Sequence, residues 1–210
     1  MFRIVCLLIG YLFGMIQTSY IIGKMSGIDI REHGSKNAGF TNTNRVLGIK
    51  KGAVVFVVDI AKAMLAFAVA TFAAGSMNIA AGGTFFASNY VLPGLYAGFG
   101  AILGHVFPAF LKFKGGKGVA CALGLIIMLD WRVMAISFAI GLLAVLITRF
   151  ISVASLFITL SVPTLMFVFG YSLEAVGITA AICALIWFLH RDNIRRLLSG
   201  TENKFSFTKK

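Results

Sequence analysis

Charged side chains are scarce in this sequence, and acidic ones are the scarcest. Only 12% of the 210 residues are charged, and 7 of them are acidic, whereas 59% are hydrophobic. A soluble domain of this length could not bury so much apolar surface. The composition therefore predicts an all-α integral membrane protein. Because no polar, Pro-rich or Ser-rich linker divides the chain, we expect a single domain over residues 1–210.

Clustered metal ligands and paired cysteines are also lacking. Cys6, Cys121 and Cys183 lie far apart in apolar stretches, which excludes a disulfide framework and a Cys-based metal motif. No His, Cys and carboxylate cluster has the spacing of a ligand set, so we expect no metal and no organic cofactor. No small-residue cleavage pattern follows the first apolar run, and we expect no cleaved signal peptide.

The net charge of +12 would ordinarily raise nucleic acid as a partner. Here the basic residues lie in short blocks between apolar runs, a pattern typical of membrane topology and of sites for small anions. We therefore expect contact with membrane lipid and with anionic substrates, and no nucleic acid.

Apolar runs of about 20 residues predict transmembrane helices. With about seven spans, nearly all basic blocks fall on one side, and the positive-inside rule puts the N-terminus outside and the C-terminus in the cytoplasm. The fourth run is too short to cross at ~1.5 Å per residue unless it extends into the preceding Gly-rich stretch or the membrane thins. A charge-free loop is expected near residues 75–89. The expected spans cover approximately residues 4–22, 52–74, 92–111, 119–129, 133–148, 151–169 and 173–189.

The first polar loop, from Gly34 to Arg45, is dense in Gly, Asn, Thr and Ser. Such a stretch offers backbone N–H groups and short hydroxyl and amide donors, and the Arg45 guanidinium fits a phosphate in a bidentate way. An ordinary polar loop between helices is the alternative. The candidate phosphate ligands here are Ser35, Asn37, Thr41, Asn42 and Arg45.

The second stretch reads Lys114, Gly115, Gly116, Lys117, Gly118 and opens a helix. Glycines let backbone N–H groups approach a phosphate, the helix N-terminus adds partial positive charge, and the lysines pair with the anion. The spacing is not that of a Walker A motif. A basic anchor for anionic lipid head groups is the alternative interpretation.

The third stretch begins at His190, at the cytoplasmic end of the last span. If the helix continues, His190 and Asn193 share a face. We include both among the site residues with Arg191, while a basic flank that stops membrane transfer is the alternative. Ser155, at the start of the sixth span on the same side, is an additional candidate donor.

Two features inside the spans have structural interpretations. Asp59 and Lys62 lie three residues apart in an apolar run, and ionisable groups in a membrane tend to pair or to line a cavity. We predict that they pair and support the site, with direct substrate contact as the alternative. Gly10 and Gly14 are spaced for close packing of helices.

Taken together, these motifs resemble the PlsY family, the bacterial acyl-phosphate:glycerol-3-phosphate acyltransferases, over nearly the whole chain. The sequence departs from the usual family pattern of Gly, Pro, Ala and Thr at Lys36, Ala38, Phe40 and Cys121, respectively. The resemblance rests on the following stretches: residues 11–14, the loop ending at Arg45, the pair Asp59 and Lys62, residues 104–120, residues 190–197 and residues 200–202.

The resemblance implies transfer of a fatty acyl group from acyl phosphate to the sn-1 hydroxyl of glycerol 3-phosphate. The products would be 1-acyl-glycerol 3-phosphate (lysophosphatidic acid) and phosphate, in the first acylation of phospholipid synthesis. The His-x-x-x-x-Asp motif of other glycerolipid acyltransferases is absent, as the family would have it. The expected location is the bacterial plasma (inner) membrane, with the active site on the cytoplasmic side.

No Ser or Cys nucleophile with a partnered base stands out, which favours direct attack of the glycerol hydroxyl on the acyl carbonyl. Arg45 and Lys117 would stabilise charge on the leaving phosphate. The base is open: His190 takes the proton, or an oxygen of the acyl phosphate takes it while His190 orients a substrate. We expect Arg45, Lys117 and His190 to be the catalytic residues.

Three other functions remain as alternatives. A transporter for a phosphorylated solute would suit the phosphate loops and the Asp59 and Lys62 pair, but no inverted repeat is found. A lipid-head transferase with a nucleotide-linked donor commonly needs several Asp for a metal, and acidic residues are few. The third is a structural partner of other lipid enzymes. An acyl-phosphate-producing enzyme is a candidate docking partner for the basic cytoplasmic face.

Overall fold

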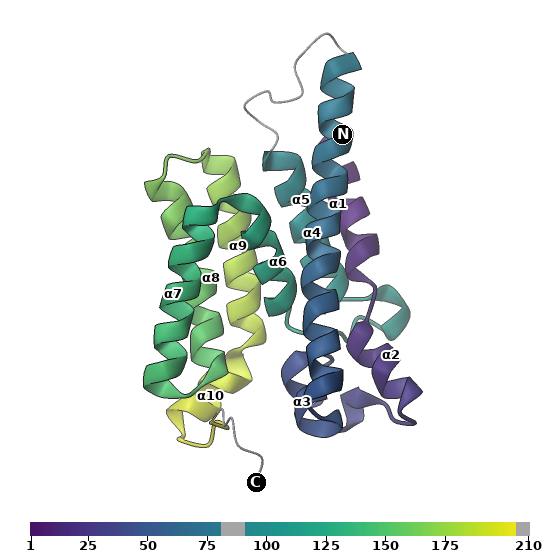
Figure 1. Ribbon diagram of the computed structural model, residues 1–210, viewed down its shortest axis with the longest axis vertical. Coiled ribbons are helices and arrows are strands. Elements are labelled where there is room, and N and C mark those ends of the chain that lie inside the picture. Colours follow the sequence, from purple (N-terminus) through teal and green to yellow (C-terminus); the bar gives the residue numbers. More distant parts are fainter. Residues whose placement is uncertain (81–90, 205–210) are drawn as a thin grey trace. The chain divides into compact units, whose positions relative to one another are not determined.

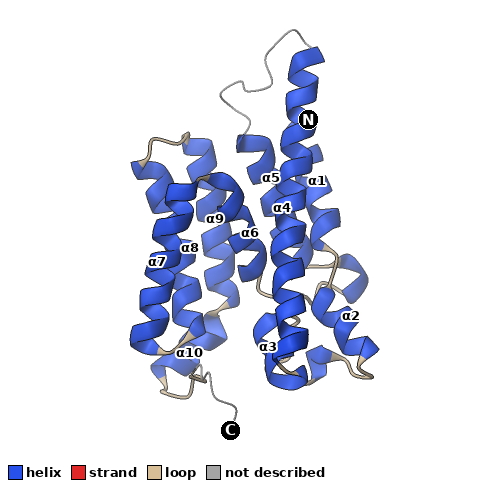
Figure 2. Cartoon of the chain, viewed as in Figure 1, coloured by secondary structure: helices blue, strands red, loops and turns tan. Residues whose placement is uncertain are grey.

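The computed structural model describes residues 1–80 and 91–204, and every regular element within those ranges is a helix (Figure 2). The all-α prediction is therefore confirmed for the described residues. The chain divides into two compact units, Met1–Met128 (unit 1) and Leu129–Lys210 (unit 2). A single domain over residues 1–210 stays a prediction beside this division.

Unit 1 is built on α1, α4 and α5, which pack against one another, and the short helices α2 and α3 pack against α4 (Figure 1). α4 continues six residues beyond its predicted end at Ala74, because those residues include no proline to stop the helix. The rest of the loop expected near 75–89 lies outside the described residues. The elements are α1 Phe2–Gly14, α2 Thr18–Met25, η1 Ile30–Glu32, α3 Phe40–Leu47, α4 Ile49–Ala80, α5 Val91–Val106, η2 Ala109–Leu111 and α6 Val119–Leu129.

The closest helix contact in unit 1 is made through glycines on both partners. A Cβ atom at Gly10 or Gly14 of α1 would overlap the carbonyl of Ala97 or Ala101 on α5. In return, a Cβ at Gly100 or Gly104 of α5 would overlap backbone carbonyls of α1. The predicted packing role of Gly10 and Gly14 is confirmed. Such close approach is how helices associate where lipid removes the hydrophobic drive.

The first predicted span is interrupted between α1 and α2. The break frees carbonyl groups at Gly14 and Ile16 that a continuous helix would have bonded. Gln17 Nε2 donates to the Gly14 carbonyl at 3.3 Å, and Lys62 Nζ donates to the Ile16 carbonyl at 2.6 Å. Two polar side chains within the unit therefore replace the missing backbone bonds.

Unit 2 consists of α7 Trp131–Thr148, α8 Ile151–Val168, α9 Leu173–Leu189 and α10 Arg191–Leu198. α7 packs on α8, and α8 packs on α9. Hydroxyl groups join the first pair, where Ser161 Oγ donates to Ser137 Oγ at 2.8 Å. Asp130, the residue between α6 and α7, caps the start of α7, where its carboxylate accepts from the backbone N–H of Arg132.

Five helical segments among the described residues are long and apolar enough to cross a membrane, or six if the bent pair α9 and α10 counts as one. The fourth predicted run, α6, has 11 residues and measures about 16 Å at ~1.5 Å per residue, against a hydrocarbon core of roughly 30 Å. The structure thus gives this helix the same short length as the sequence predicted.

Candidate functional site

The first predicted phosphate loop is organised by Asn42, which is fully buried at the start of α3. Its Oδ1 accepts from the backbone N–H of Ser35 at 2.8 Å, and its Nδ2 donates to the carbonyls of Ile30 and His33. The carboxamide, expected among the phosphate ligands, is thus engaged by the loop backbone. These hydrogen bonds fix the conformation of the loop that carries Ser35.

The other predicted ligands of this loop lie at its surface. Ser35, Thr41 and Arg45 are exposed, and Asn37 is half-buried. Left-handed backbone flanks Ser35, with φ of 58° at Gly34 and 59° at Lys36. Lys36 thus adopts a left-handed backbone conformation that favours glycine and that costs free energy at a residue with a side chain.

The second predicted loop is fixed by backbone hydrogen bonds to the end of α5. Gly115 N–H donates to the Val106 carbonyl at 3.0 Å, and Gly116 N–H donates to the His105 carbonyl at 3.1 Å. Gly118, with φ of 81°, turns the chain into α6, where Ala122 N–H donates to its carbonyl. Lys114 is exposed and Lys117 is half-buried, on either side of the two glycines.

The structure brings these two loops together. A Cβ atom at Gly116 would lie 2.6 Å from the carbonyl oxygen of Ala38, so glycine is required where the loops touch. Arg31 adds a second link by donating to the Leu111 carbonyl at 3.3 Å. Hydrogen bonding by the Arg31 guanidinium lowers the pKa of the Asp29 carboxyl to about 2, which keeps that carboxylate charged and the link in place.

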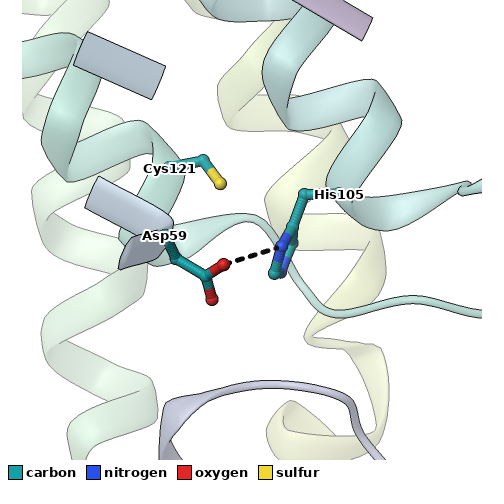
Figure 3. Close-up of side chains that lie close together, drawn as sticks. All are labelled: Asp59, His105 and Cys121. Carbon is teal, nitrogen blue, oxygen red and sulfur yellow. Dashed lines mark ion pairs between the residues drawn. The ribbon is translucent and has the colours of Figure 1, made fainter. Parts of the chain in front are cut away.

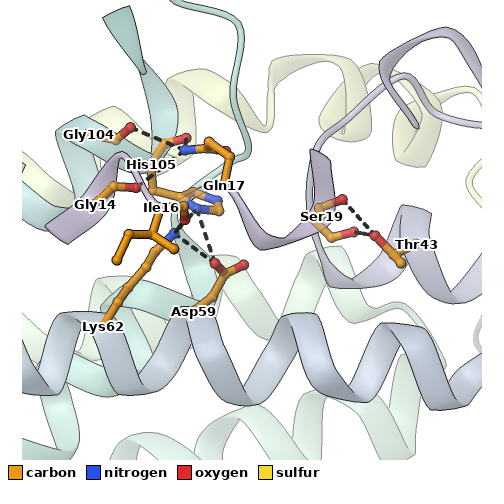
Figure 4. Close-up of polar contacts among 10 residues, drawn as sticks. Gly14, Ile16, Gln17, Ser19, Thr43, Asp59, Lys62, Gly104 and His105 are labelled. Carbon is orange, nitrogen blue, oxygen red and sulfur yellow. Dashed lines mark hydrogen bonds and ion pairs between the residues drawn. The ribbon is translucent and has the colours of Figure 1, made fainter. Parts of the chain in front are cut away.

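Behind the second loop lies a buried charged cluster (Figure 4). Lys62 Nζ is 2.7 Å from Asp59 Oδ1, so the predicted pairing of these two residues is confirmed. Lys62 Nζ is also 3.0 Å from His105 Nδ1, and Gln17 Nε2 donates to the His105 carbonyl at 3.0 Å. Sequence reasoning missed His105 and Gln17 as parts of the site. The available signal was a polar residue in an apolar span next to the glycine stretch.

Asp59, His105 and Cys121 form a group whose candidate ligand atoms all lie within 4.8 Å of one another (Figure 3). A transition metal binds such donors in general. Here the Lys62 ammonium already contacts both Asp59 and the Nδ1 of His105, and a second cation beside it would be repelled. The group therefore fits an ion pair better than a metal ion.

The third predicted stretch lies in unit 2, where the helix does not continue through His190. α9 ends at Leu189, the chain bends by 56°, and α10 begins at Arg191. His190 is buried at this junction and its Nδ1 lies 2.8 Å from the Ile186 carbonyl. A nitrogen facing a carbonyl oxygen carries the proton, which makes Nε2 the basic nitrogen of the neutral ring.

Glu202 is a further residue that the sequence analysis did not select for a role. Its carboxylate accepts from Asn193 Nδ2 at 2.7 Å, Arg196 Nε at 2.6 Å and Ser152 Oγ at 3.0 Å. Burial raises the pKa of Glu202, but these three hydrogen bonds outweigh it and the net shift is downward. Glu202 thus holds Asn193, α10 and the start of α8 together as a charged group.

The two remaining candidates of unit 2 make local contacts. Ser155 is buried, and its hydroxyl donates to the Ile151 carbonyl at 3.0 Å. Arg191 is exposed, and its guanidinium lies 4.6 Å from the centroid of the Phe188 ring. Neither contact by itself points to a phosphate.

Comparison with known proteins decides the family. The family model described as glycerol-3-phosphate acyltransferase matches residues 4–200. This chain belongs to the glycerol-3-phosphate acyltransferase family. The glycerol-3-phosphate acyltransferase of Carboxydothermus hydrogenoformans is 36% identical over 98% of each chain. The Aquifex aeolicus protein of the same name is 40% identical, over 93% of this chain and 95% of that one.

Solved structures of this family agree in fold. The structure titled PlsY (YgiH), an integral membrane glycerol 3-phosphate acyltransferase in its glycerol 3-phosphate form, has a TM-score of 0.84 at 36% identity. It covers 97% of this chain and 96% of that one, and the lysophosphatidic acid form of that protein has a TM-score of 0.81. This acyltransferase is an integral, multi-pass membrane protein of the PlsY type.

Proposed function

We propose that this acyltransferase moves a fatty acyl group from acyl phosphate to the sn-1 hydroxyl of glycerol 3-phosphate, releasing 1-acyl-glycerol 3-phosphate and phosphate. The observation that carries the proposal is the meeting, at Gly116 and Ala38, of a basic Gly-rich loop with a loop rich in Gly and Asn, in a member of this family. The donor and the acceptor each carry a phosphate, and one carries a long chain that needs an apolar surround.

The two loops of unit 1 supply the phosphate contacts in this proposal. Arg45 offers a planar pair of N–H donors, and Lys117 offers a point charge at the start of α6. Ser35 and Thr41 add hydroxyl groups at the exposed face of the first loop, with Asn37, Lys114 and the backbone of Gly115, Gly116 and Gly118 as further donors. Positive charge at this position stabilises the charge that develops on the leaving phosphate.

The chemical step is direct attack of the glycerol hydroxyl on the acyl carbonyl, without an acyl-enzyme. The bond between the acyl carbon and the phosphate oxygen breaks, and the hydroxyl proton passes to the departing phosphate. His190 orients the acceptor by accepting through Nε2 from a hydroxyl other than the attacking one, since its Nδ1 proton is held by the Ile186 carbonyl. Asn193, Arg191 and Ser155 are proposed as additional donors from unit 2. An unchanged chemical rate in His190→Ala would exclude both a base and an orienting role.

The proposed topology has seven crossings, with the N-terminus outside and the site on the cytoplasmic side of a bacterial plasma membrane. The supporting observation is that the basic blocks of both phosphate loops and of the C-terminal stretch sort to one side only if α6 crosses. Single cysteines introduced at Lys50 and Trp131, in a chain without its own cysteines, test this. Impermeant labelling of intact cells should modify only the second position.

The function is tested with purified protein supplied with glycerol 3-phosphate and one of three donors: acyl phosphate, acyl-CoA or acylated acyl carrier protein. Phosphate release and lysophosphatidic acid are followed together. Product from acyl phosphate alone, lost in Arg45→Ala and Lys117→Ala, is the expected result. Product from acyl-CoA with none from acyl phosphate would overturn the donor assignment. Folded protein that makes no product with any donor would turn attention to transport of glycerol 3-phosphate into liposomes.

A further inference from the structure

The imidazole of His105 is wedged between two groups of different kinds. On one side its Nδ1 lies 3.0 Å from Lys62 Nζ and 3.6 Å from Asp59 Oδ1 (Figure 4). On the other side its Nε2 abuts Gly116, where a Cβ atom would overlap it. The residue is 3% exposed. The ring therefore lies in contact with α4 on one side and with the glycine loop on the other.

The contacts of Lys62 indicate which nitrogen of the neutral His105 ring carries the proton. The Lys62 ammonium, which can only donate, hydrogen-bonds to the Ile16 carbonyl at 2.6 Å and to His105 Nδ1 at 3.0 Å, while its contact with Asp59 Oδ1 at 2.7 Å is an ion pair. Because Nδ1 faces a donor, it serves as an acceptor, and the proton of the neutral ring resides on Nε2. The ring is then held in one orientation by a pair that is itself fixed within the membrane spans.

The main chain of His105 acts in the same direction as the ring. Its carbonyl accepts from Gly116 N–H at 3.1 Å and from Gln17 Nε2 at 3.0 Å, and the next carbonyl, of Val106, accepts from Gly115 N–H. Gly116 is therefore held by the backbone and the side chain of the same residue. The residue after Gly116 is Lys117. The Ala38 carbonyl of the first loop lies against Gly116 itself.

A buried charged pair is an expensive way to fill space between helices. Ionisable groups inside a membrane cost free energy, and apolar side chains of similar volume are often equally stable or more so. What the pair supplies that an apolar core would not is a directed hydrogen bond to one nitrogen of one ring. Because that ring lies directly behind Gly115 and Gly116, the group whose position depends on it is the glycine loop.

We propose that His105 is a positioning residue of the phosphate site, held by Asp59 and Lys62, and that it sets the Gly115–Gly116 backbone and through it Lys117. This rests on the proposed function, since the loop it sets is the one assigned to phosphate. His105 touches no reacting atom in this scheme. Asp59 and Lys62 act through it.

Two substitutions separate a positioning role from a merely structural one, because each retains a different end of the ring. His105→Asn keeps an acceptor near Nδ1 for Lys62 but removes the part of the ring against Gly116. His105→Gln reaches toward Gly116 but removes the acceptor for Lys62. A structural role predicts that stability and activity rank the two variants in the same order. A positioning role predicts opposite orders.

The measurements are the unfolding temperature in detergent, and kcat and KM for acyl phosphate and glycerol 3-phosphate. We expect His105→Asn to unfold near the wild-type temperature yet lose about 10- to 100-fold in kcat/KM, the cost of a small misplacement of a binding group. We expect His105→Gln to unfold earlier and to keep more of kcat/KM. The exposed His33→Asn is the matched control and should stay within about twofold, as surface substitutions generally do.

A His105→Asn variant with wild-type kcat/KM for both substrates would overturn the proposal, as would a folded His105→Gln variant that is the less active of the two. If neither variant folds, Gln17→Met decides, because it releases the His105 carbonyl without touching the ring. A wild-type KM there would contradict positioning, and a raised KM would support it. Wild-type protein that makes no product would instead refute the proposed function.

Discussion

The two units handle buried polar groups in different ways. Unit 1 buries a carboxylate, an ammonium and an imidazole together between α4 and α5. Unit 2 fills its interior with neutral hydroxyls such as Ser137 and Ser161, and its hydrogen-bonded carboxylates, Asp130 and Glu202, lie outside the long helices. Burying a charged group in a membrane costs more free energy than burying a hydroxyl. The difference therefore indicates that the charged groups of unit 1 have a role beyond packing.

Breaking the charged pair of unit 1 gives the largest expected effect on stability. Lys62→Met leaves the Asp59 carboxylate buried without its ammonium, which costs about 3–5 kcal/mol in comparable cases. Chemical unfolding of the purified protein in detergent measures the loss. The double variant Asp59→Leu with Lys62→Met should recover much of it while activity stays low. A single variant as stable as the wild type would remove the distinction between the units.

Filling the glycine loop gives the largest expected effect on catalysis. A Cβ at Gly115 would overlap the His105 carbonyl, so Gly115→Ala must shift the loop. A shift of about 1 Å in a binding group costs about 100-fold in rate, which kcat/KM for acyl phosphate reports. Gly177→Ala in α9 is the matched control, because nothing lies within 4 Å of its added Cβ. Equal activities in the two variants would contradict the loop geometry.

Acidification should affect unit 2 through Glu202. Its pKa is lowered in the folded protein, so its contribution to stability is complete above the ordinary value of 4.5 and is lost as pH falls below that value toward the folded pKa. Glu202→Gln should cost about 1–3 kcal/mol at neutral pH and show less further loss on acidification. Thermal unfolding between pH 7 and pH 3 compares it with the exposed Asp192→Asn. Parallel pH curves for Glu202→Gln and the wild type would show that another group is responsible.

The hydroxyl pair of unit 2 gives the smallest expected effect. Ser137→Ala removes one partner of the Ser161 hydrogen bond, and such bonds between membrane helices average about 0.6 kcal/mol. A double-mutant cycle with Ser161→Ala, read by chemical unfolding, isolates that coupling. A coupling as large as that between Asp59 and Lys62 would mean that neutral and charged contacts are equivalent here.

The sequence was sufficient for the helical class, the glycine packing of α1 and the pairing of Asp59 with Lys62, because each follows from local pattern and cost. It did not predict that Asn42 would hold its own loop, since an amide in a polar loop suits a ligand and a brace equally. His105, Gln17 and Glu202 were missed for another reason. Gln17 lies 88 residues from His105, His105 lies 43 from Lys62, and Glu202 lies 50 from Ser152, so that only the fold brings these partners into contact.

The measurement that tests the central claim most directly is equilibrium binding of glycerol 3-phosphate to the purified protein, without donor, in wild type and in Arg45→Ala and Lys117→Met. The exposed Lys50→Ala, which also removes one positive charge, is the control. If the two loops form the phosphate site, both site variants lose about tenfold or more in affinity, as expected on losing a hydrogen bond to a charged group, while the control binds as the wild type does. Equal affinity in all four proteins would contradict the account.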